Sequence, residues 1–252
     1  FGSLAATDRP QYREPFEPLM PGVRFIEPGD EAMARAAITA ERTAAIIVEP
    51  IQGEGGVRPL DRSYLRLLRE LADLAGAALI FDEVQCGLGR TGEFLAYQAM
   101  GVEPDILTLA KPLAGGLPMG ATLLTDRIAG AIRPGDHATT FGGGPLVSSV
   151  ALEVVERVAA PSFLAGVRER GEHVAAVLRG WVGKGIIREA RGLGLIQGVE
   201  LAEAAAPVIA RALEAGLLLV AAGERVVRIL PPLTIEMDEL DHGLTILEEV
   251  LS

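Results

Sequence analysis

The sequence predicts an α/β fold, in which a mostly parallel sheet flanked by helices is followed by a smaller α+β unit. Three short apolar runs, 45–48, 78–81 and 106–109, are typical of buried strands. Helical patterns alternate with these runs, and such alternation favours a parallel sheet with helices on its faces. The length of 252 residues suits a large and a small domain. We therefore expect a large domain over 1–150 and a small C-terminal domain over 151–252.

The elements of the first domain follow from the spacing of apolar residues. Residues 63–74 carry leucines at helical spacing and predict an amphipathic helix, which Ser63 can cap. Residues 120–124 form a fourth apolar run, and a long helical pattern over 146–178 predicts a helix that enters the second domain. Because the chain begins at Phe1 rather than at Met, we expect an N-terminal part of the large domain to be missing.

The second domain is predicted as an α+β unit of under a hundred residues. We expect, in order, strand 195–201, helix 206–215, strands 217–220 and 226–230, and helix 238–251. Arg188 and Arg191 precede the first of these strands, and we expect both at the surface or in dimer contacts.

Composition excludes several classes of function. With 23 Lys and Arg against 34 Asp and Glu, the formal net charge is −11, which repels phosphate backbones and anionic lipid. We therefore expect no nucleic-acid and no membrane partner, and no apolar run approaches the roughly 20 residues of a membrane span. Cys86 is the only cysteine, which favours a reducing compartment, the cytoplasm. Three scattered histidines and one cysteine predict no metal site.

Each of the three apolar strands ends in an ionisable residue, and glycines follow. Glu49 comes after the first strand, Asp82 after the second and Lys111 after the third. In an open parallel α/β sheet, ligands gather at the carboxyl ends of the strands. We therefore expect these loops to build one polar pocket.

The loop after the second strand contains Gly87-x-Gly89-x-x-Gly92, which fits the dinucleotide-binding fingerprint. A dinucleotide-binding oxidoreductase is therefore the alternative from a different class. Asp82 and Glu83 argue against it, because they place negative charge where a pyrophosphate would lie. Arg90 is interpreted as a structural residue that ties this loop.

A pyridoxal phosphate site fits the strand ends better. That cofactor needs a lysine amine for its aldehyde and a carboxylate against its pyridine nitrogen, and Lys111 and Asp82 can supply both. Only Lys111 and Lys184 are lysines among the 23 basic residues, and Lys184 has the character of a loop surface residue. We expect Lys111 to be partly desolvated after its buried strand, although a snorkelling surface lysine is the bland alternative.

Six motifs, in order, resemble those of the class-III (ω-amino acid) aminotransferases, and the resemblance covers nearly the whole chain. They are EPIQGEGG at 49–56, FDEVQ at 81–85, GLGRTG at 87–92, AKPLAGG at 110–116, HATTFGG at 137–143 and VRILPPL at 227–233. The resemblance implies pyridoxal-phosphate fold type I, in which a mostly parallel sheet is flanked by helices.

The resemblance also implies a role for each matching residue around the cofactor. Lys111 would bind pyridoxal phosphate covalently and move the proton, and Asp82 would pair with the pyridine nitrogen. Gln85 would approach the phenolic oxygen of the ring, and Val84 would pack on the ring face. Thr140 would bind the cofactor phosphate of a partner subunit, which implies a homodimer with shared sites.

For the substrates, Arg228 would bind the α-carboxylate of 2-oxoglutarate or glutamate, and Glu54 would mask Arg228 while the ω-amino substrate is bound. The implied reaction is transamination between an ω-amino acid derivative and 2-oxoglutarate, giving a semialdehyde and glutamate, in arginine or lysine biosynthesis. Acetylornithine is the favoured donor, and carrier-bound lysine, ornithine and 4-aminobutyrate are the alternatives.

The sequence departs from the family pattern in two respects. Gly144 stands where the family usually has asparagine, so we expect a looser loop there. The family also has an earlier Ser-Gly-Ala loop and an aromatic-His-Gly-Arg stretch, which precede the point where this sequence begins. We therefore expect this chain to hold the lysine and to lack much of the phosphate cradle. A non-catalytic fragment that folds poorly alone is the third hypothesis.

Overall fold

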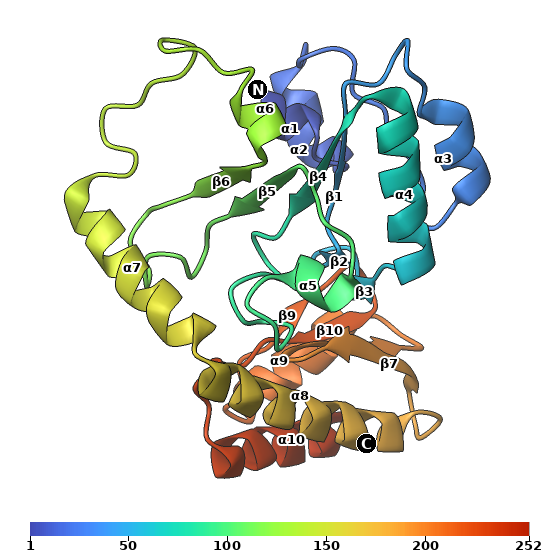
Figure 1. Ribbon diagram of the computed structural model, residues 1–252. Coiled ribbons are helices and arrows are strands. Elements are labelled where there is room, and N and C mark those ends of the chain that lie inside the picture. Colours follow the sequence, from blue (N-terminus) through green and yellow to red (C-terminus); the bar gives the residue numbers. More distant parts are fainter. Residues whose placement is uncertain (252) are drawn as a thin grey trace.

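The computed structural model describes residues 1–251, and its larger unit is built on a four-stranded sheet (Figure 1). The strand order is β1 (Ala45–Val48), β4 (Ala78–Asp82), β5 (Ile106–Leu109) and β6 (Ala121–Leu124). The first three strands run parallel, and β6 pairs antiparallel with β5. The mostly parallel sheet is thus confirmed, and its three parallel strands begin at the predicted positions.

Helix α4 (Arg62–Ala75) covers one face of this sheet and confirms the amphipathic helix predicted over 63–74. Its apolar face buries Leu65 and Leu68 together with Leu79 and Phe81 of β4. Burial of such side chains stabilises the fold by about 1.5–3 kcal/mol each. The helix ends at Gly76, which adopts the left-handed conformation with φ 67°.

Short elements surround the sheet. They are α1 (Gly2–Ala5), α2 (Pro10–Arg13), η1 (Glu14–Phe16), α3 (Glu31–Ala37), β2 (Ile51–Gln52), β3 (Arg58–Pro59), α5 (Ala96–Met100) and α6 (Asp126–Ala129). The hairpin of β2 and β3 directly follows β1 and carries Glu54 in its turn. The helix α5 was not predicted, because the stretch after Gly92 is short and lacks a helical period.

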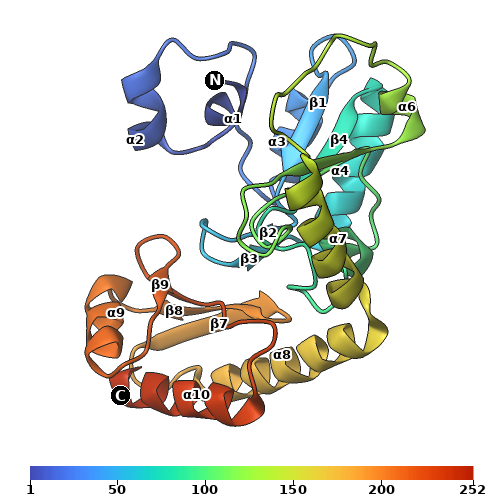
Figure 2. The ribbon, with the colours of Figure 1, turned by 90° about the vertical axis from the view of Figure 1, so that its left-hand side faces the viewer.

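The single helix predicted over 146–178 is wrong, since the structure has two helices there, α7 (Pro145–Ala159) and α8 (Pro161–Trp181). Ala160 between them is extended, with φ −62° and ψ 129°. A residue before proline is pushed out of the helical region by the proline ring, so Pro161 forces the break. The chain bends here, and α8 runs along the sheet of the small unit (Figures 1 and 2).

The smaller unit is an antiparallel sheet with helices packed against it. Its strands are β7 (Ile187–Leu193), β8 (Ile196–Leu201), β10 (Val226–Ile229) and β9 (Val220–Ala221), in that spatial order. The sheet packs on α8, α9 (Ala205–Glu214) and α10 (Met237–Leu251) around a second core. The strand predicted over 217–220 is largely wrong, because only Val220 of it lies in a strand. The division of the chain at residue 150 stays a prediction.

The strand β7 was missed, because its polar side chains hide the strand pattern. Arg191 was expected at the surface or in dimer contacts, and it does not lie at the surface: its side chain is 11% exposed and forms ion pairs with Glu189 and Glu200. Its Nε also donates to the backbone oxygen of Gly56 at 2.9 Å. This contact joins the small unit to the hairpin turn that carries Glu54.

Within residues 1–251, no helix is long and apolar enough to cross a bilayer.

Candidate active site

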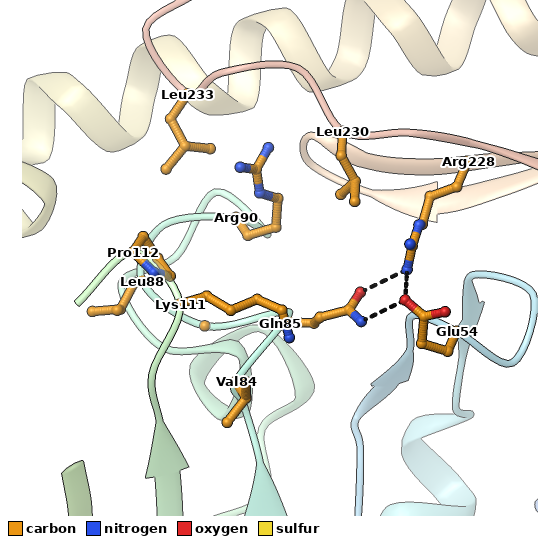
Figure 3. A pocket seen from close by; sticks show the side chains of 11 residues that line it. Glu54, Val84, Gln85, Leu88, Arg90, Lys111, Pro112, Arg228, Leu230 and Leu233 are labelled. Atoms are coloured by element: carbon orange, nitrogen blue, oxygen red, sulfur yellow. Dashed lines mark hydrogen bonds and ion pairs between the residues drawn. The ribbon is translucent and has the colours of Figure 1, made fainter. Parts of the chain in front are cut away.

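Several of the predicted site residues line one cavity of about 280 Å³ between the two units (Figure 3). The cavity brings together Glu54, Val84, Gln85, Lys111 and Arg228. The apolar side chains of Leu88, Leu230 and Leu233 also line it. Asp82 and Thr140 are not among its lining residues.

Asp82 and Lys111 both lie at the carboxyl ends of the parallel strands of the large sheet. Asp82 ends β4 and is paired in register with Thr108 of β5. Its Oδ1 accepts a hydrogen bond from Thr108 Oγ1 at 3.2 Å and another from the backbone N–H of Val84 at 3.0 Å. Lys111 follows the end of β5 by two positions. Parallel strands therefore carry a fixed carboxylate and an amine to a common edge, as the sequence predicts.

The partial desolvation expected for Lys111 is absent, since its side chain is exposed. The chain turns at Lys111, which has a positive φ of 21°, and then leaves the sheet. Of the following loop, Leu113 and Ala114 are buried and Pro112 is exposed. The lysine thus lies at an open side of the cavity.

Arg228 is one of three cationic side chains that line the cavity, with Arg90 and Lys111, and it is held by two loops of the large unit. Its Nη1 donates to Glu54 Oε1 at 2.6 Å and to Gln85 Oε1 at 3.0 Å. Gln85 Nε2 in turn donates to Glu54 Oε1 at 3.2 Å, so the three side chains form a closed group (Figure 3). Arg228 projects from β10, in the interior of the small sheet, and its side chain is 9% exposed, whereas that of Glu54 is 58% exposed.

Electrostatics favour the ionised form of Glu54. Burial by itself raises the pKa of Glu54, but the hydrogen bond and charge of Arg228, the amide of Gln85 and the charge of Arg9 outweigh it. The net pKa of Glu54 therefore lies below its usual value. The Nε of Arg228 is buried without a hydrogen-bond partner among the described residues. Glu54 and Arg228 thus form a charged pair that faces the cavity.

Gly53 makes room for the amide of Gln85. A Cβ atom added to Gly53 would lie 1.9 Å from Gln85 Oε1, far inside contact distance. The backbone N–H of Gly53 donates to Glu49 Oε2 at 3.1 Å, so the Glu49 side chain helps to hold the turn in place. Burial, followed by the charge of Asp82, raises the pKa of Glu49, although the Gly53 hydrogen bond and Lys111 oppose this. Sequence reasoning missed the role of Gly53, because the close contact joins two turns that are far apart in the sequence.

The neighbouring residues Asp82 and Glu83 accept hydrogen bonds from different parts of the structure. Glu83 is 1% exposed, and its oxygens accept from the backbone N–H groups of Ala96 at 2.6 Å and Tyr97 at 2.7 Å. It therefore satisfies the free donors at the start of α5. Burial raises the pKa of Glu83 to about 7, despite these two hydrogen bonds. Glu83 is a structural acid beside the site.

The glycine loop 87–92 is packed against protein and is not a phosphate cradle. A Cβ at Gly89 would lie 2.8 Å from Val158 Cγ1, and one at Gly92 would lie 2.5 Å from Arg168 Cγ. Arg90 Nη1 donates to the backbone oxygens of Leu195 at 3.1 Å and Pro231 at 2.6 Å. Burial lowers the pKa of Arg90 to about 10. The glycines therefore permit close packing against α7 and α8, and the structure does not favour the dinucleotide alternative.

Thr140 lies on an exposed loop and does not line the cavity. The neighbouring Phe141 is 89% exposed, and Gly144 stands at the N-cap of α7. The role predicted for Thr140 requires a second subunit and stays a prediction. Among residues 1–251, no group of three or more His, Cys, Asp or Glu side chains is arranged to hold a metal ion.

The chain is similar to known aminotransferases over nearly all of its length. The family model described as Aminotransferase class-III matches residues 1–251. A mitochondrial acetylornithine aminotransferase of Alnus glutinosa is 50% identical, over 99% of this chain and 56% of the relative. An acetylornithine aminotransferase of Methanocaldococcus jannaschii is 45% identical, over 99% of this chain and 63% of the relative. The chain thus spans about three fifths of these relatives' length.

Solved structures agree with the sequence comparison. An ornithine aminotransferase of Toxoplasma gondii, described with partial occupancy of PLP at its active site, has a TM-score of 0.92 at 33% identity, over 98% of this chain and 60% of that one. An N-acetylornithine aminotransferase of Stenotrophomonas maltophilia has a TM-score of 0.82 at 36% identity, over 90% of this chain and 61% of that one. Fold and sequence therefore point to the same family.

Proposed function

Because this chain belongs to the class-III aminotransferases, we propose that the full protein transfers an amino group from an ω-amino acid derivative to 2-oxoglutarate. The products are a semialdehyde and glutamate. Acetylornithine is the first candidate donor, because two relatives of that name are 50% and 45% identical to this chain. The observation that carries the proposal is the Glu54–Arg228 pair, which faces the same cavity as Lys111. Arginine biosynthesis is the pathway in which such a reaction would serve.

Class-III aminotransferases use pyridoxal phosphate, and the residues present fit its chemical requirements. When bound, this cofactor withdraws electrons from the carbon that carries the substrate amine. Lys111 supplies the primary amine that would hold its aldehyde carbon. Asp82, oriented by Thr108 and the Val84 N–H, supplies the anion that would keep a proton on the ring nitrogen. Both side chains belong to one edge of the sheet.

Lys111 would also move the proton of the reaction. Whenever its amine does not hold the cofactor, Lys111 would lie beside the substrate carbon and could take up a proton there and return it. Leu88, Leu230 and Leu233 give the same cavity an apolar wall, although Lys111 itself is exposed. Val84 and Gln85 would contact the ring, as the resemblance implies. These roles are supported by the common cavity of Lys111, Val84 and Gln85.

The Glu54–Arg228 pair would let one site accept two kinds of amino group. While the ω-amine of the donor reacts, no carboxylate is needed at Arg228, and Glu54 keeps that guanidinium paired. When glutamate reacts through its α-amine, its α-carboxylate would take Arg228, and Glu54 would swing away. The exposed Glu54 is free to move, whereas the buried Arg228 is fixed in the small sheet. Specificity would thus come from masking and unmasking one cation.

We also propose a homodimer in a reducing compartment. Phe141, which is 89% exposed, stands next to Thr140 on the loop that the resemblance brings to a partner subunit. The single Cys86 is buried, and burial raises the pKa of its thiol, so it is an unreactive side chain. The compartment stays a proposal, because one of the relatives is a mitochondrial protein. Sedimentation of the full-length protein measures its oligomeric state.

The first experiment locates the reactive amine. Full-length protein is loaded with pyridoxal phosphate, reduced with borohydride and digested, and the modified peptide is identified by mass spectrometry. We expect the label on Lys111, and Lys184→Ala should not change it. Label on Lys184, or on no lysine, would refute the assignment.

The same protein is then assayed with 2-oxoglutarate and a panel of donors. We expect the largest kcat/KM for acetylornithine, ahead of ornithine and 4-aminobutyrate. Carrier-bound lysine belongs in the panel as the remaining alternative. A larger kcat/KM for any of these three would replace acetylornithine as the donor and leave the reaction class intact.

A further inference from the structure

Arg9 places a second guanidinium beside Glu54. Its Nη2 donates to the backbone oxygen of Glu54 at 2.9 Å, although the two residues are 45 positions apart. Arg9 is half-buried and stands at the N-cap of α2, whose first residue is Pro10. Within the described residues, its guanidinium makes no other hydrogen bond or ion pair. Most N–H donors of this group are therefore free for a further acceptor.

Glu54 needs such a group whenever its carboxylate leaves Arg228. The side chain of Arg228 is 9% exposed and lies in an inner strand, so Glu54, at 58% exposed, is the member of the pair that moves. A carboxylate without a cation would tend to return to Arg228 and compete with the substrate carboxylate. Arg9 already holds the carbonyl of the same residue, so a rotation of the Glu54 side chain can bring its carboxylate to that guanidinium.

We propose that Arg9 receives the Glu54 carboxylate when Arg228 binds the α-carboxylate of glutamate or 2-oxoglutarate. Arg9 is thus a positioning residue that sets the balance between the two substrate classes, and it touches neither substrate. This inference rests on the proposed function, because it presumes that Arg228 binds a carboxylate. The influence of Arg9 on Glu54 is also electrostatic, since the charge of Arg9 is among the causes that lower the pKa of Glu54.

The test compares carboxylate binding with donor binding in full-length protein saturated with pyridoxal phosphate. Glutarate is the probe, because it has the two carboxylates of 2-oxoglutarate and no reactive carbonyl. We expect Arg9→Met to weaken glutarate binding about tenfold by calorimetry, the scale of one charge-assisted hydrogen bond. The KM for the ω-amino donor should change by less than about twofold, because Glu54 then stays on Arg228. Arg9→Lys keeps the charge and should restore most of the glutarate affinity.

Arg13→Met is the matched control. Arg13 is the last residue of α2, the helix that Arg9 precedes, and its guanidinium lies 4.9 Å from the centre of the Phe25 ring. This variant should change neither the affinity for glutarate nor the KM for the ω-amino donor. Unchanged glutarate affinity in Arg9→Met, or equal weakening of glutarate and donor, would overturn the proposal. If Arg9→Met is unstable, Arg9→Gln gives the same comparison. Failure of the proposed function is distinct, because the wild-type protein would then turn over no ω-amino donor, whatever residue stands at position 9.

Discussion

At the scale of single residues, the Nη1 atom of Arg228 connects two loops of the candidate site by hydrogen bonds. It donates to Glu54 and Gln85, which belong to loops after different strands. Gln85 reaches this pair only because Gly53 has no side chain: its amide oxygen would lie 1.9 Å from an added Cβ. The glycine of the hairpin turn therefore decides the hydrogen bonding of an arginine 175 positions further along the chain.

We expect Gly53→Ala to expel the Gln85 amide from the Glu54–Arg228 pair. The new methyl group overlaps the amide, and Gln85 must adopt another rotamer and give up two hydrogen bonds. The free energy of unfolding should fall by about 1–3 kcal/mol, which denaturant titration of the full-length protein measures. Gly55→Ala is the control, because its new Cβ would meet the Gln52 side chain no closer than 3.3 Å. Equal losses in both variants would contradict the role of Gly53.

At the scale of elements, the short helix α5 depends on a buried acid. Glu83 is placed by β4 and accepts hydrogen bonds from the first two N–H groups of α5. Burial holds its folded pKa at about 7, above its ordinary value of 4.5. The folded chain thus keeps a proton that the unfolded chain has lost over this pH range. The free energy of unfolding therefore falls as pH rises from 4.5 to about 7.

Glu83→Gln should remove this part of the pH dependence. Glutamine cannot ionise, and its amide oxygen can still accept from one of the two N–H groups. The free energy of unfolding of the variant minus that of the wild type should therefore increase, by up to about 3 kcal/mol, as the pH rises from acidic to neutral. Denaturant unfolding at several pH values measures this gain. Glu70→Gln replaces an exposed carboxyl of α4, and it should leave the slope unchanged. An identical slope in Glu83→Gln and wild type would show that Glu83 does not titrate there.

At the scale of the whole molecule, glycines hold the two units close together. A Cβ at Gly194 would lie 2.5 Å from the backbone oxygen of Arg90, and one at Gly92 would lie 2.5 Å from Arg168 Cγ of α8. The backbone N–H of Leu195 donates to Arg90 at 2.9 Å, and the Arg90 side chain returns two hydrogen bonds to the small unit. This close backbone contact holds the small unit, which carries Arg228, against the large unit, which carries Lys111, and both residues line the cavity.

Gly194→Ala should separate the units and lower the melting temperature of the full-length protein by several degrees, about 4 °C or more, in a calorimetric scan. The new methyl group would clash with backbone atoms of Arg90 and Thr91, which cannot move aside alone. Gly216→Ala is the matched control, because Gly216 also has a positive φ of 86° but nothing within 4 Å of its added Cβ. The control measures the cost of the backbone conformation alone. If both variants melt together, close packing at Gly194 contributes nothing.

The sequence by itself determined most of the local helices and strands and the position of Asp82 and Lys111 at the ends of two of those strands. Apolar runs place the parallel strands, because buried strands need continuous apolar side chains, and the residues that follow them must meet at one edge of a parallel sheet. Asp82 and Lys111 follow from that rule. Pro161 breaks the long helix, and this break follows from a local rule, because a proline pushes the residue before it, Ala160, out of the helical region.

Only the tertiary structure decided which side chains meet across the two units. The resemblance had implied the pairing of Glu54 with Arg228, but nothing in the sequence pointed to the contact of Arg9 with Glu54, because periodicity carries no information on contacts between separate elements. The same holds for the glycines of the loop 87–92, whose spacing fits a phosphate cradle but whose neighbours are α7 and α8. Pairings of this kind depend on how folded units dock, and docking is fixed by packing over the whole chain rather than by any one segment.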